Sequence, residues 1–416
     1  MNTPVYMDNH ATTRVDPRVV EVMLPYFTEK IGNAGSTTHS FGFNAKAAVD
    51  ESRKIIASAI GAKAKDIVFT SGATESNNLA ICGAAEKLSS KGKHLISVAT
   101  EHPSVLEPLE KLGRRGFEVT LLPVIPSPND HAGLIQIEQL ADALRDDTIL
   151  VSVMLANNEI GVIQPLAEIG RICKEQGVLL HTDATQAVGK IPVDVDELQV
   201  DLMSFTAHKI YGPKGIGALY VRHSNPQTRL DPLIVGGGQE SGLRSGTLNV
   251  PGIVGFARAI ELCLQEMPDE QIRLRQLRDR LYQGLTSALS GVSLNGPSLG
   301  DCPNSHRDCP NFRPDENGTV PFLLRIPGNL NLSIDDVAGE TLLLNLNDLA
   351  LSTGSACTSA NPEPSHVLQA LALSEEQILG SVRFGLGRFN TAEEVDFAIG
   401  KIAETVTRLR SMLKII

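Results

Sequence analysis

Tryptophan is absent from this 416-residue sequence, and all aromatic residues together make up only 4% of it. Proteins that bind single-stranded nucleic acids stack the bases on aromatic side chains, so that kind of binding surface is not expected here. Acidic side chains outnumber basic ones by 48 to 37, which gives a net charge of −11. This acidic balance argues against a nucleic-acid-binding protein, which usually carries a basic patch.

Long apolar runs and dense cysteines are missing as well. No stretch of about 18 uninterrupted apolar residues occurs, so we expect no membrane-spanning helix and no membrane partner. Residues 1–20 lack the basic and apolar regions of a secretory signal, which favours a soluble cytoplasmic protein. Six cysteines among 416 residues are too few for a disulfide scaffold, so each is interpreted by its position.

Short apolar runs alternate with helical patterns in the first two thirds of the chain. Strands are predicted at 67–70, 94–98, 118–122, 148–153, 178–182, 201–205 and 217–221. Helices are predicted between most of them, at 74–88, 103–113, 136–144 and 165–176. This alternation predicts an α/β fold with a mainly parallel sheet, in which ligands bind beyond the carboxyl ends of the strands.

The last third of the chain has a different pattern. Leucines recur on one helical face from Leu274 to Leu289, which predicts an amphipathic helix over 269–290. A long polar loop over 297–321 follows, then strands at 322–332 and 381–385 and helices at 336–346 and 392–413. We therefore predict two domains: a large α/β domain over 17–265, and a smaller α+β domain formed by residues 1–16 and 266–416.

The residues from 201 to 220 form the most informative segment. An apolar strand ends in Thr206-Ala-His208-Lys209, and a turn rich in glycine and proline follows. A lysine in such a strand-end loop can form a Schiff base with a carbonyl cofactor, and Thr206 and His208 could contact a phosphate on it. Taken alone, Lys209 could equally be an ordinary exposed lysine.

Two other loops support a cofactor site. Asp183 ends the preceding strand and could pair with the ring nitrogen of pyridoxal phosphate, although an aspartate there could also simply cap a helix. Ala73 and Thr74 lie between a strand and a helix, where phosphate can bind but where a capping box is also common. The three elements in this order together predict a pyridoxal-phosphate site.

Two more polar residues follow strands. His102 could stack on the cofactor ring and move protons, unless it is a solvated loop histidine. Asn158 could form a hydrogen bond with the cofactor or the substrate. Both are candidates for the same site, because the carboxyl ends of parallel strands lie at one edge of a sheet.

Cys357 lies in a loop of small and polar residues that offers nothing to bury it. An exposed loop cysteine is a candidate nucleophile, and the alternative is an incidental surface thiol. Three other cysteines lie beside apolar residues in predicted helices and are expected to pack there: Cys82, Cys173 and Cys263. Cys302 and Cys309 lie in the 297–321 loop, where a disulfide or a metal site stays an open alternative; their spacing matches no standard zinc pattern, so no stable metal site is expected.

In these motifs the chain resembles the pyridoxal-phosphate-dependent cysteine desulfurases of the NifS/IscS type, within the class V aminotransferase family. The matching segments run through nearly the whole chain, at 7–13, 71–76, 100–103, 157–161, 183–186, 208–215, 244–249, 355–359 and 383–388. The resemblance implies the fold type I of pyridoxal-phosphate-dependent transferases, with a large parallel-sheet domain and a smaller α+β domain.

The resemblance also implies a role for each site residue. Lys209 would hold the cofactor covalently, Asp183 would pair with its ring nitrogen and His102 would stack on it. Arg383 would bind the substrate carboxylate, with Asn158 beside it. Further cofactor contacts would come from Ala73, Thr74, Asn158, Gln186, Thr206, His208 and, across a homodimer, Thr247 of the other subunit.

The implied reaction removes sulfur from L-cysteine, releases L-alanine and leaves a persulfide on Cys357. That sulfur would pass to an acceptor such as an iron–sulfur scaffold or a sulfur-relay protein, for iron–sulfur cluster assembly or thiolation. At a scaffold, Cys357 could briefly ligate a nascent cluster. Two alternatives stay open: a selenocysteine lyase or cystine/cysteine C–S lyase on the same fold, and a non-catalytic interaction protein that keeps the fold.

Two features depart from the family pattern. The 297–321 loop lengthens a connection that is usually short, which is compatible with a partner or regulator specific to this chain. Gly385 stands where serine is more usual, so the geometry around the nearby Arg383 is expected to differ in detail.

Overall fold

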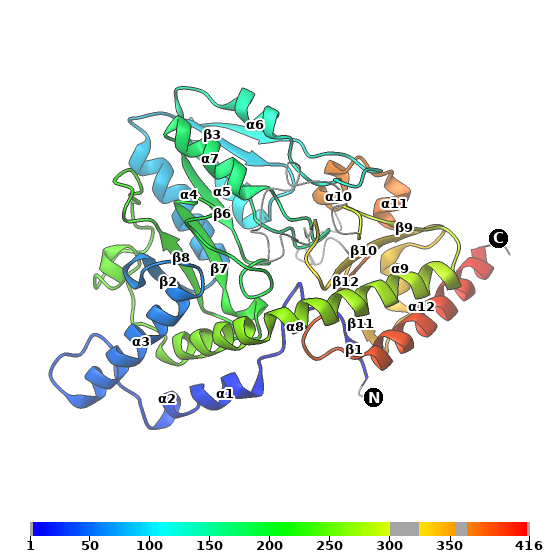
Figure 1. The fold of residues 1–416 in the computed structure, drawn as a ribbon, viewed down its shortest axis with the longest axis horizontal. Helices are drawn as coiled ribbons and strands as arrows, with labels where there is room; N and C mark the ends of the chain where they lie inside the picture. Colours follow the sequence, from blue (N-terminus) through cyan, green and yellow to red (C-terminus); the bar gives the residue numbers. More distant parts are fainter. Residues whose placement is uncertain (1–2, 300–323, 354–363, 414–416) are drawn as a thin grey trace, which may run out of the picture.

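The computed structural model describes residues 3–299, 324–353 and 364–413. Figure 1 shows a larger and a smaller part side by side, with the long helix α8 (Val250–Ala288) running along both. The two ends of the chain lie on the side of the smaller part. The division into domains over 17–265 and over 1–16 with 266–416 stays a proposal, and its boundary at 265/266 falls within α8.

The larger part is built around a sheet of seven strands, counted within the described residues. Their order is β2 (Ile67–Thr70), β8 (Gly217–Val221), β7 (Leu202–Thr206), β6 (Leu179–Asp183), β5 (Thr148–Ser152), β3 (His94–Val98) and β4 (Glu118–Leu122). Neighbouring strands are parallel except at β8, which runs antiparallel to both of its neighbours. The predicted mainly parallel α/β fold is therefore confirmed.

Helices cover both faces of this sheet. One face carries α4 (Ala73–Leu88) and α5 (Pro103–Gly113), and the other carries α3 (Ser40–Ser58), α7 (Leu166–Gln176) and the first half of α8. Successive residues of a strand point to opposite faces, so Leu95 packs in one hydrophobic core and Ile96 in the other. Burial on both faces explains why these strands appear in the sequence as continuous apolar runs.

Shorter helices complete the larger part: α1 (Pro17–Met23), α2 (Pro25–Thr28) and α6 (Ile137–Ala143). The three cysteines predicted to pack in helices are indeed buried, in α4, α7 and α8: Cys82, Cys173 and Cys263. Within the described residues, no helix combines the length and the apolar character that a membrane crossing requires.

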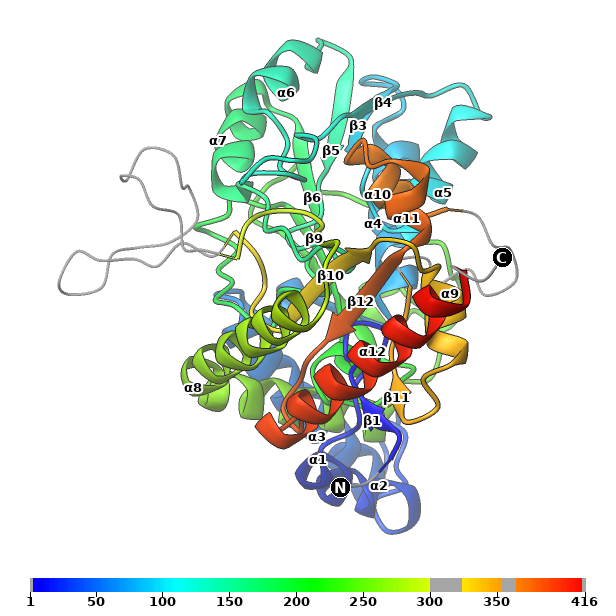
Figure 2. The ribbon, with the colours of Figure 1, turned by 90° about the vertical axis from the view of Figure 1, so that its right-hand side faces the viewer.

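The smaller part has its own hydrophobic core and a three-stranded antiparallel sheet in the order β12 (Ser381–Gly385), β10 (Asn329–Ile334) and β9 (Val292–Leu294). Figure 2 shows α8 and α12 (Ala392–Leu413) lying across this sheet. A short parallel pair joins β1 (Val5–Tyr6) to β11 (Leu349–Ala350), so the N-terminal residues belong to this part. The remaining helices are α9 (Gly339–Leu344), α10 (His366–Ala370) and α11 (Glu375–Leu379).

Three elements have bounds that differ from the prediction by three residues or more at one end. The strand predicted at 322–332 is β10, Asn329–Ile334, and the helix predicted at 336–346 is the shorter α9. The helix predicted at 269–290 begins at Val250 and continues through Pro268. Proline leaves the carbonyl of Leu264 without its usual helical partner, because Pro268 has no N–H to donate.

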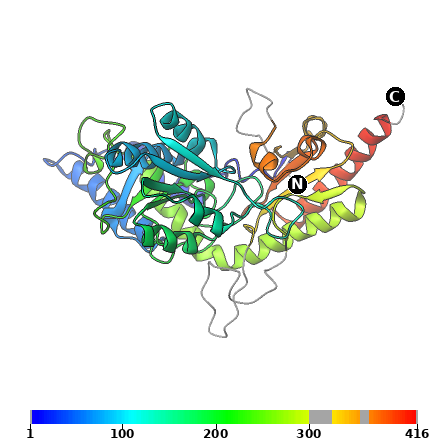
Figure 3. The ribbon, with the colours of Figure 1, turned by 90° about the horizontal axis from the view of Figure 1, so that it is seen from above.

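Helix α8 continues through the proline because both of its halves are buried in hydrophobic cores. Ile253 and Phe256 pack in the core of the larger part, whereas Leu277 and Leu281 pack in the core of the smaller part. Figure 3 shows the helix passing beneath both parts. This shared helix brings the carboxyl edge of the large sheet close to residues of the small domain.

Candidate active site

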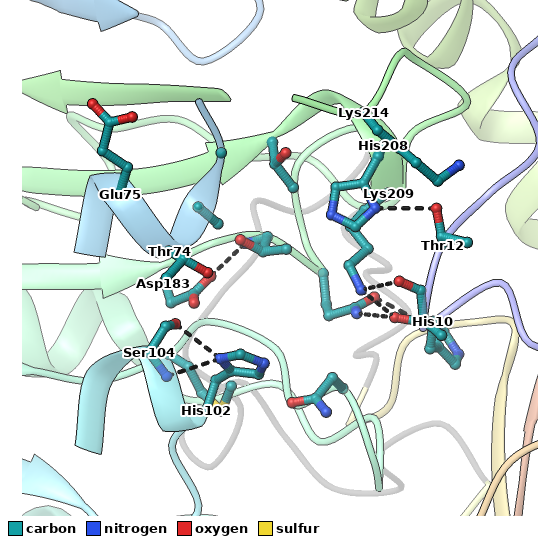
Figure 4. Close-up of a pocket in the computed structure, with 18 of the residues that line it drawn as sticks. His10, Thr12, Thr74, Glu75, His102, Ser104, Asp183, His208, Lys209 and Lys214 are labelled. Atoms are coloured by element: carbon teal, nitrogen blue, oxygen red, sulfur yellow. Dashed lines mark hydrogen bonds between the residues drawn. The ribbon is translucent and has the colours of Figure 1, made fainter. Parts of the chain in front are cut away.

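A cavity of about 450 Å³ lies where β6 and β7 end. Asp183 is the last residue of β6, and Thr206 is the last residue of β7. Figure 4 shows side chains from several elements directed into the cavity. Ten of the site residues predicted from the sequence line it: Ala73, Thr74, His102, Asn158, Asp183, Gln186, Thr206, His208, Lys209 and Arg383.

Lys209 lies in a single 3₁₀ turn, Ala207–Lys209, directly after β7. Its Nζ donates hydrogen bonds of 2.6 Å to the backbone carbonyls of both His10 and Ala11, as Figure 4 shows for His10. The amine therefore lies within the cavity against the N-terminal segment. From there it can react with a carbonyl group of a bound molecule.

Asp183 is buried, and both of its carboxylate oxygens accept hydrogen bonds. Oδ1 accepts from the backbone N–H of Thr185 at 2.9 Å, and Oδ2 accepts from Nδ2 of Asn77 at 2.7 Å. Donors directed at both oxygens fix the orientation of this carboxylate. A carboxylate held in this way can pair with a protonated ring nitrogen.

The residues expected to bind phosphate lie around the start of α4. Ala73 and Thr74 open this helix, and the N-cap residue, Gly72, offers no side-chain hydrogen bond. The helix start thus combines backbone N–H groups with the positive end of the helix dipole, which suits an anion. Burial, together with the cations Lys209 and Lys214, lowers the pKa of the neighbouring His208 to about 4. His208 is therefore a neutral side chain near pH 7.

His102 is the N-cap residue of α5. Its Nδ1 lies 2.8 Å from the hydroxyl of Ser104 and accepts a hydrogen bond of 3.1 Å from the backbone N–H of the same serine. Burial lowers the pKa of His102, which favours the neutral ring. Figure 4 shows the side of the ring away from Ser104 turned toward the cavity.

Gln186 is held by the N-terminal segment and by the partly buried Lys190. Its Nε2 donates to the carbonyl of His10 at 2.9 Å, and its Oε1 accepts from Nζ of Lys190 at 2.6 Å. The same Oε1 lies 3.2 Å from Nδ1 of His10. Burial, reinforced by the charges of Lys190 and Arg383, holds the pKa of His10 well below its ordinary value.

Arg383 reaches the cavity from β12 of the smaller part, and only 1% of its side chain is exposed. Its Nη1 donates to the carbonyl of Asn158 at 3.1 Å, and its Nη2 pairs with Oδ1 of Asp8 at 2.9 Å. A carboxylate therefore already contacts this guanidinium, a partner that the sequence analysis did not identify. Any further carboxylate that binds this guanidinium has to share it with Asp8.

Of the described site residues predicted from the sequence, Thr247 does not line this cavity. Cys357 lies outside the described residues, as do Cys302 and Cys309. Thr247 is exposed on the segment after Arg244, whose strand-like pairing with Ile234 fixes the local backbone. An exposed threonine is compatible with the contact to another subunit that the family resemblance implies.

Sequence reasoning assigned no role to several residues that line the cavity. His10, Ala11 and Thr12 enter it from the N-terminal segment, and Lys214 enters it from the turn after β7. The segment 7–13 was visible as a matching motif, but nothing in the sequence indicated that it meets Lys209. Asn77 contacts Asp183, but its position within a predicted helix gave no sign of that contact.

Known proteins resemble this chain over nearly its whole length. Residues 5–309 match the family model of the class-V aminotransferases. A cysteine desulfurase IscS from Anaeromyxobacter dehalogenans (strain 2CP-C) is 52% identical over 99% of this chain and 95% of its own length. A solved NifS-like protein has a TM-score of 0.83 at 37% identity, covering 97% of this chain and 99% of that one. SspA in complex with cysteine has a TM-score of 0.75 at 33% identity, covering 93% and 99%.

Proposed function

Because the chain belongs to the class-V aminotransferase family, and its full-length relatives are cysteine desulfurases, we propose that it is a pyridoxal-phosphate-dependent cysteine desulfurase acting on L-cysteine. The observation that carries the proposal is the meeting of Lys209, Asp183 and Arg383 in one cavity. Relatives named cysteine desulfurase do not favour the alternatives of a selenocysteine lyase, a C–S lyase or a non-catalytic protein.

The side chains present fit pyridoxal phosphate. Lys209 supplies an amine for its aldehyde, Asp183 supplies a carboxylate already oriented by two donors, and the start of α4 supplies an anion site. His102 would cover the ring, and the remaining contacts would come from Asn158, Gln186, Thr206 and His208. When bound, pyridoxal phosphate supplies an electron-withdrawing ring that stabilises negative charge next to the amino group of a substrate.

The protein's own residues then divide the work. Arg383 binds the substrate carboxylate, and the Nζ of Lys209 takes the proton from the substrate α-carbon and returns protons during turnover. The thiolate of Cys357 attacks the substrate sulfur, so that a sulfur–sulfur bond forms while the carbon–sulfur bond breaks. The electron pair of the broken bond stays with the substrate, which is protonated and leaves as L-alanine, and Cys357 keeps the sulfur as a persulfide.

The substitution Cys357→Ala tests this division. We expect the variant to retain the absorbance of the bound cofactor and to form less than about 1% of the parental alanine, because its sulfur acceptor is gone. Cys82→Ala, at a buried packing cysteine, is the control. Alanine and sulfide released by Cys357→Ala at the parental rate would refute the persulfide step, and pyruvate with ammonia would indicate an eliminating lyase instead.

We further propose that the protein is a homodimer in which Thr247 completes the partner's phosphate site. Large apolar side chains are exposed near α2 and α3, which is unusual for a surface without a partner: Leu24, Phe27, Ile31, Phe41 and Phe43. Val235 is 75% exposed in the segment that leads to Thr247. Arg53 of α3 and Glu240 form an ion pair at 2.6 Å, which ties this segment to α3.

The destination of the sulfur is also part of the proposal. A protein thiol, on an iron–sulfur scaffold or a sulfur-relay protein in the cytoplasm, would receive it from Cys357, which at a scaffold could briefly ligate the nascent cluster. Trapping this acceptor as a mixed disulfide with Cys357, followed by identification of the captured protein, tests the assignment. Capture that persists in Cys357→Ala would show that the trapped protein is not the acceptor.

A further inference from the structure

A continuous series of hydrogen bonds joins His102 to Asp183 through two residues that have no role in the proposed function. His102 Nδ1 lies 2.8 Å from Ser104 Oγ, and Ser104 Oγ lies 2.8 Å from Asn77 Nδ2. The same Asn77 Nδ2 lies 2.7 Å from Asp183 Oδ2. Ser104 lines the cavity, whereas Asn77 is fully buried in the second turn of α4. We call these four side chains the His102–Asp183 relay.

Which group donates and which accepts in each hydrogen bond of the relay follows from the carboxylate of Asp183. An ionised carboxylate only accepts hydrogen bonds, so Asn77 must present its NH₂ group to Asp183. The reversed amide would place oxygen against oxygen. The second hydrogen of that NH₂ group points to Ser104 Oγ, which accepts it. In this orientation Asn77 Oδ1 is buried and has no hydrogen-bond partner among the described residues. A buried acceptor without a donor lowers the stability of the fold, so this orientation has a cost in free energy.

The tautomer of His102 follows in turn. The hydroxyl of Ser104 accepts from Asn77, so its single hydrogen is directed at His102 Nδ1. The backbone N–H of Ser104 donates to the same nitrogen at 3.1 Å. A nitrogen that accepts from two donors carries no hydrogen, and a neutral imidazole must then carry its hydrogen on Nε2.

We propose that Asn77 and Ser104 are positioning residues that hold His102 in the Nε2–H tautomer and couple its orientation to that of Asp183. In this tautomer His102 presents a hydrogen-bond donor, not an acceptor, to molecules in the cavity. One amide thus orients both the side chain that covers the cofactor ring and the carboxylate that pairs with the ring nitrogen. The inference rests on the proposed function, since those two roles belong to it.

The first test observes the tautomer directly in the holoenzyme with ¹⁵N-labelled histidine. The His102 signals are identified by their disappearance in His102→Gln. In the parent we expect an unprotonated Nδ1 and a protonated Nε2. Asn77→Ala touches neither the ring nor the backbone of His102, yet it should shift these signals, because the Ser104 hydroxyl loses the donor that directs its hydrogen.

The second test measures the dissociation constant for pyridoxal phosphate, by dilution of the holoenzyme and absorbance of the bound cofactor. Asn77→Ala should raise it by about tenfold or more, because Asp183 loses a charge-assisted hydrogen bond. Ser104→Ala should raise it by a smaller factor, and the double variant should show less than the sum of the two effects in free energy. Asn78→Ala removes the neighbouring amide, whose Nδ2 donates to the Thr74 carbonyl, and should change neither readout.

Unchanged His102 signals in Asn77→Ala would overturn the relay. If that variant does not fold, Ser104→Ala decides, because parental signals together with a parental dissociation constant would also overturn it. A parent protein that binds no pyridoxal phosphate, or that forms no alanine from L-cysteine, would refute the proposed function itself. The two failures are therefore distinguishable.

Discussion

Lys190 is a second, partly buried lysine in the neighbourhood of Lys209. Its Nζ donates to Gln186, and burial together with the charge of Lys209 lowers its pKa from 10.5 to about 7. Between these two values the unfolded chain binds more protons than the folded chain. The free energy of unfolding therefore rises with pH through this window, and the contribution is lost as the pH falls toward 7.

Replacing Lys190 with methionine should remove that pH dependence, because the variant has no proton to release on folding. We expect the parent to gain stability relative to Lys190→Met between about pH 7 and pH 10, measured by urea denaturation. Lys401→Met, at a partly exposed lysine on α12, is the control and should follow the parent. Parallel profiles of the parent and Lys190→Met would contradict the prediction.

If Arg383 binds the substrate carboxylate as proposed, the geometry of its guanidinium matters as well as its charge. The guanidinium is nearly fully buried and binds the carbonyl of Asn158 and the carboxylate of Asp8 in a fixed plane. Lysine keeps the charge but cannot reproduce this fork of donors. We expect Arg383→Lys to raise the KM for L-cysteine by about tenfold or more, with a smaller loss in kcat.

Steady-state alanine formation measures this effect. Arg280→Lys is a suitable control, because Arg280 forms an exposed surface pair with Asp396. Its KM should stay at the parental value. A parental KM in Arg383→Lys would exclude Arg383 from carboxylate binding.

At the scale of elements, two side chains at the start of α10 form hydrogen bonds with the larger part. The Ser365 hydroxyl donates to Oε2 of Glu159 at 2.6 Å, and Nε2 of His366 lies 2.8 Å from the carbonyl of Glu101. Burial raises the pKa of Glu159 from 4.5 to about 7, despite the hydrogen bond from Ser365. The folded chain thus binds more protons than the unfolded chain between these values, so stability falls as the pH rises through about 7.

The substitution Glu159→Gln should remove the loss of stability that comes from ionising a buried carboxyl. The glutamine keeps an oxygen that can accept the hydrogen bond from Ser365. We expect the variant to be more stable than the parent at about pH 8.5, with a smaller difference at about pH 5, measured by thermal unfolding. Glu138→Gln, in the first turn of α6, is the comparison and should be neutral. A difference of equal size at both pH values would show that the carboxyl of Glu159 does not titrate as stated.

At the scale of the whole molecule, the exposed apolar side chains of α2 and α3 predict which substitutions would break the proposed homodimer. Phe41 and Phe43 are 52% and 54% exposed, and a glutamate in their place would put charge into an apolar interface. We expect Phe41→Glu with Phe43→Glu to sediment as a monomer and to bind pyridoxal phosphate more weakly, because Thr247 of the other subunit is withdrawn.

Analytical ultracentrifugation and cofactor absorbance provide the two measurements. Leu344→Glu is the matched control, since Leu344 is 80% exposed on α9 in the smaller part. Leu344→Glu should leave the oligomeric state and the cofactor absorbance unchanged. A double variant that remains dimeric would place the interface elsewhere.

Much of the fold and part of the site follow from local sequence patterns. The strands 94–98, 118–122 and 381–385 and the helices 103–113 and 392–413 have the predicted bounds, because apolar periodicity over a few residues determines them. The residues at strand ends, Asp183 and Lys209, were expected at one sheet edge for the same reason and do line one cavity. Proline at position 268 misled the prediction, because packing on both sides kept α8 continuous.

The sequence by itself determined the α/β class, the strand ends that carry Asp183 and Lys209, and the packing role of the three helical cysteines. Only the tertiary structure decided which distant residues meet there. His10 accepts from Lys209, Asp8 pairs with Arg383, and Asn77 orients Asp183. These contacts join residues that are from about one hundred to nearly four hundred positions apart, and no local periodicity encodes such pairs. They form because the packed cores and the shared helix α8 bring the two parts of the chain together.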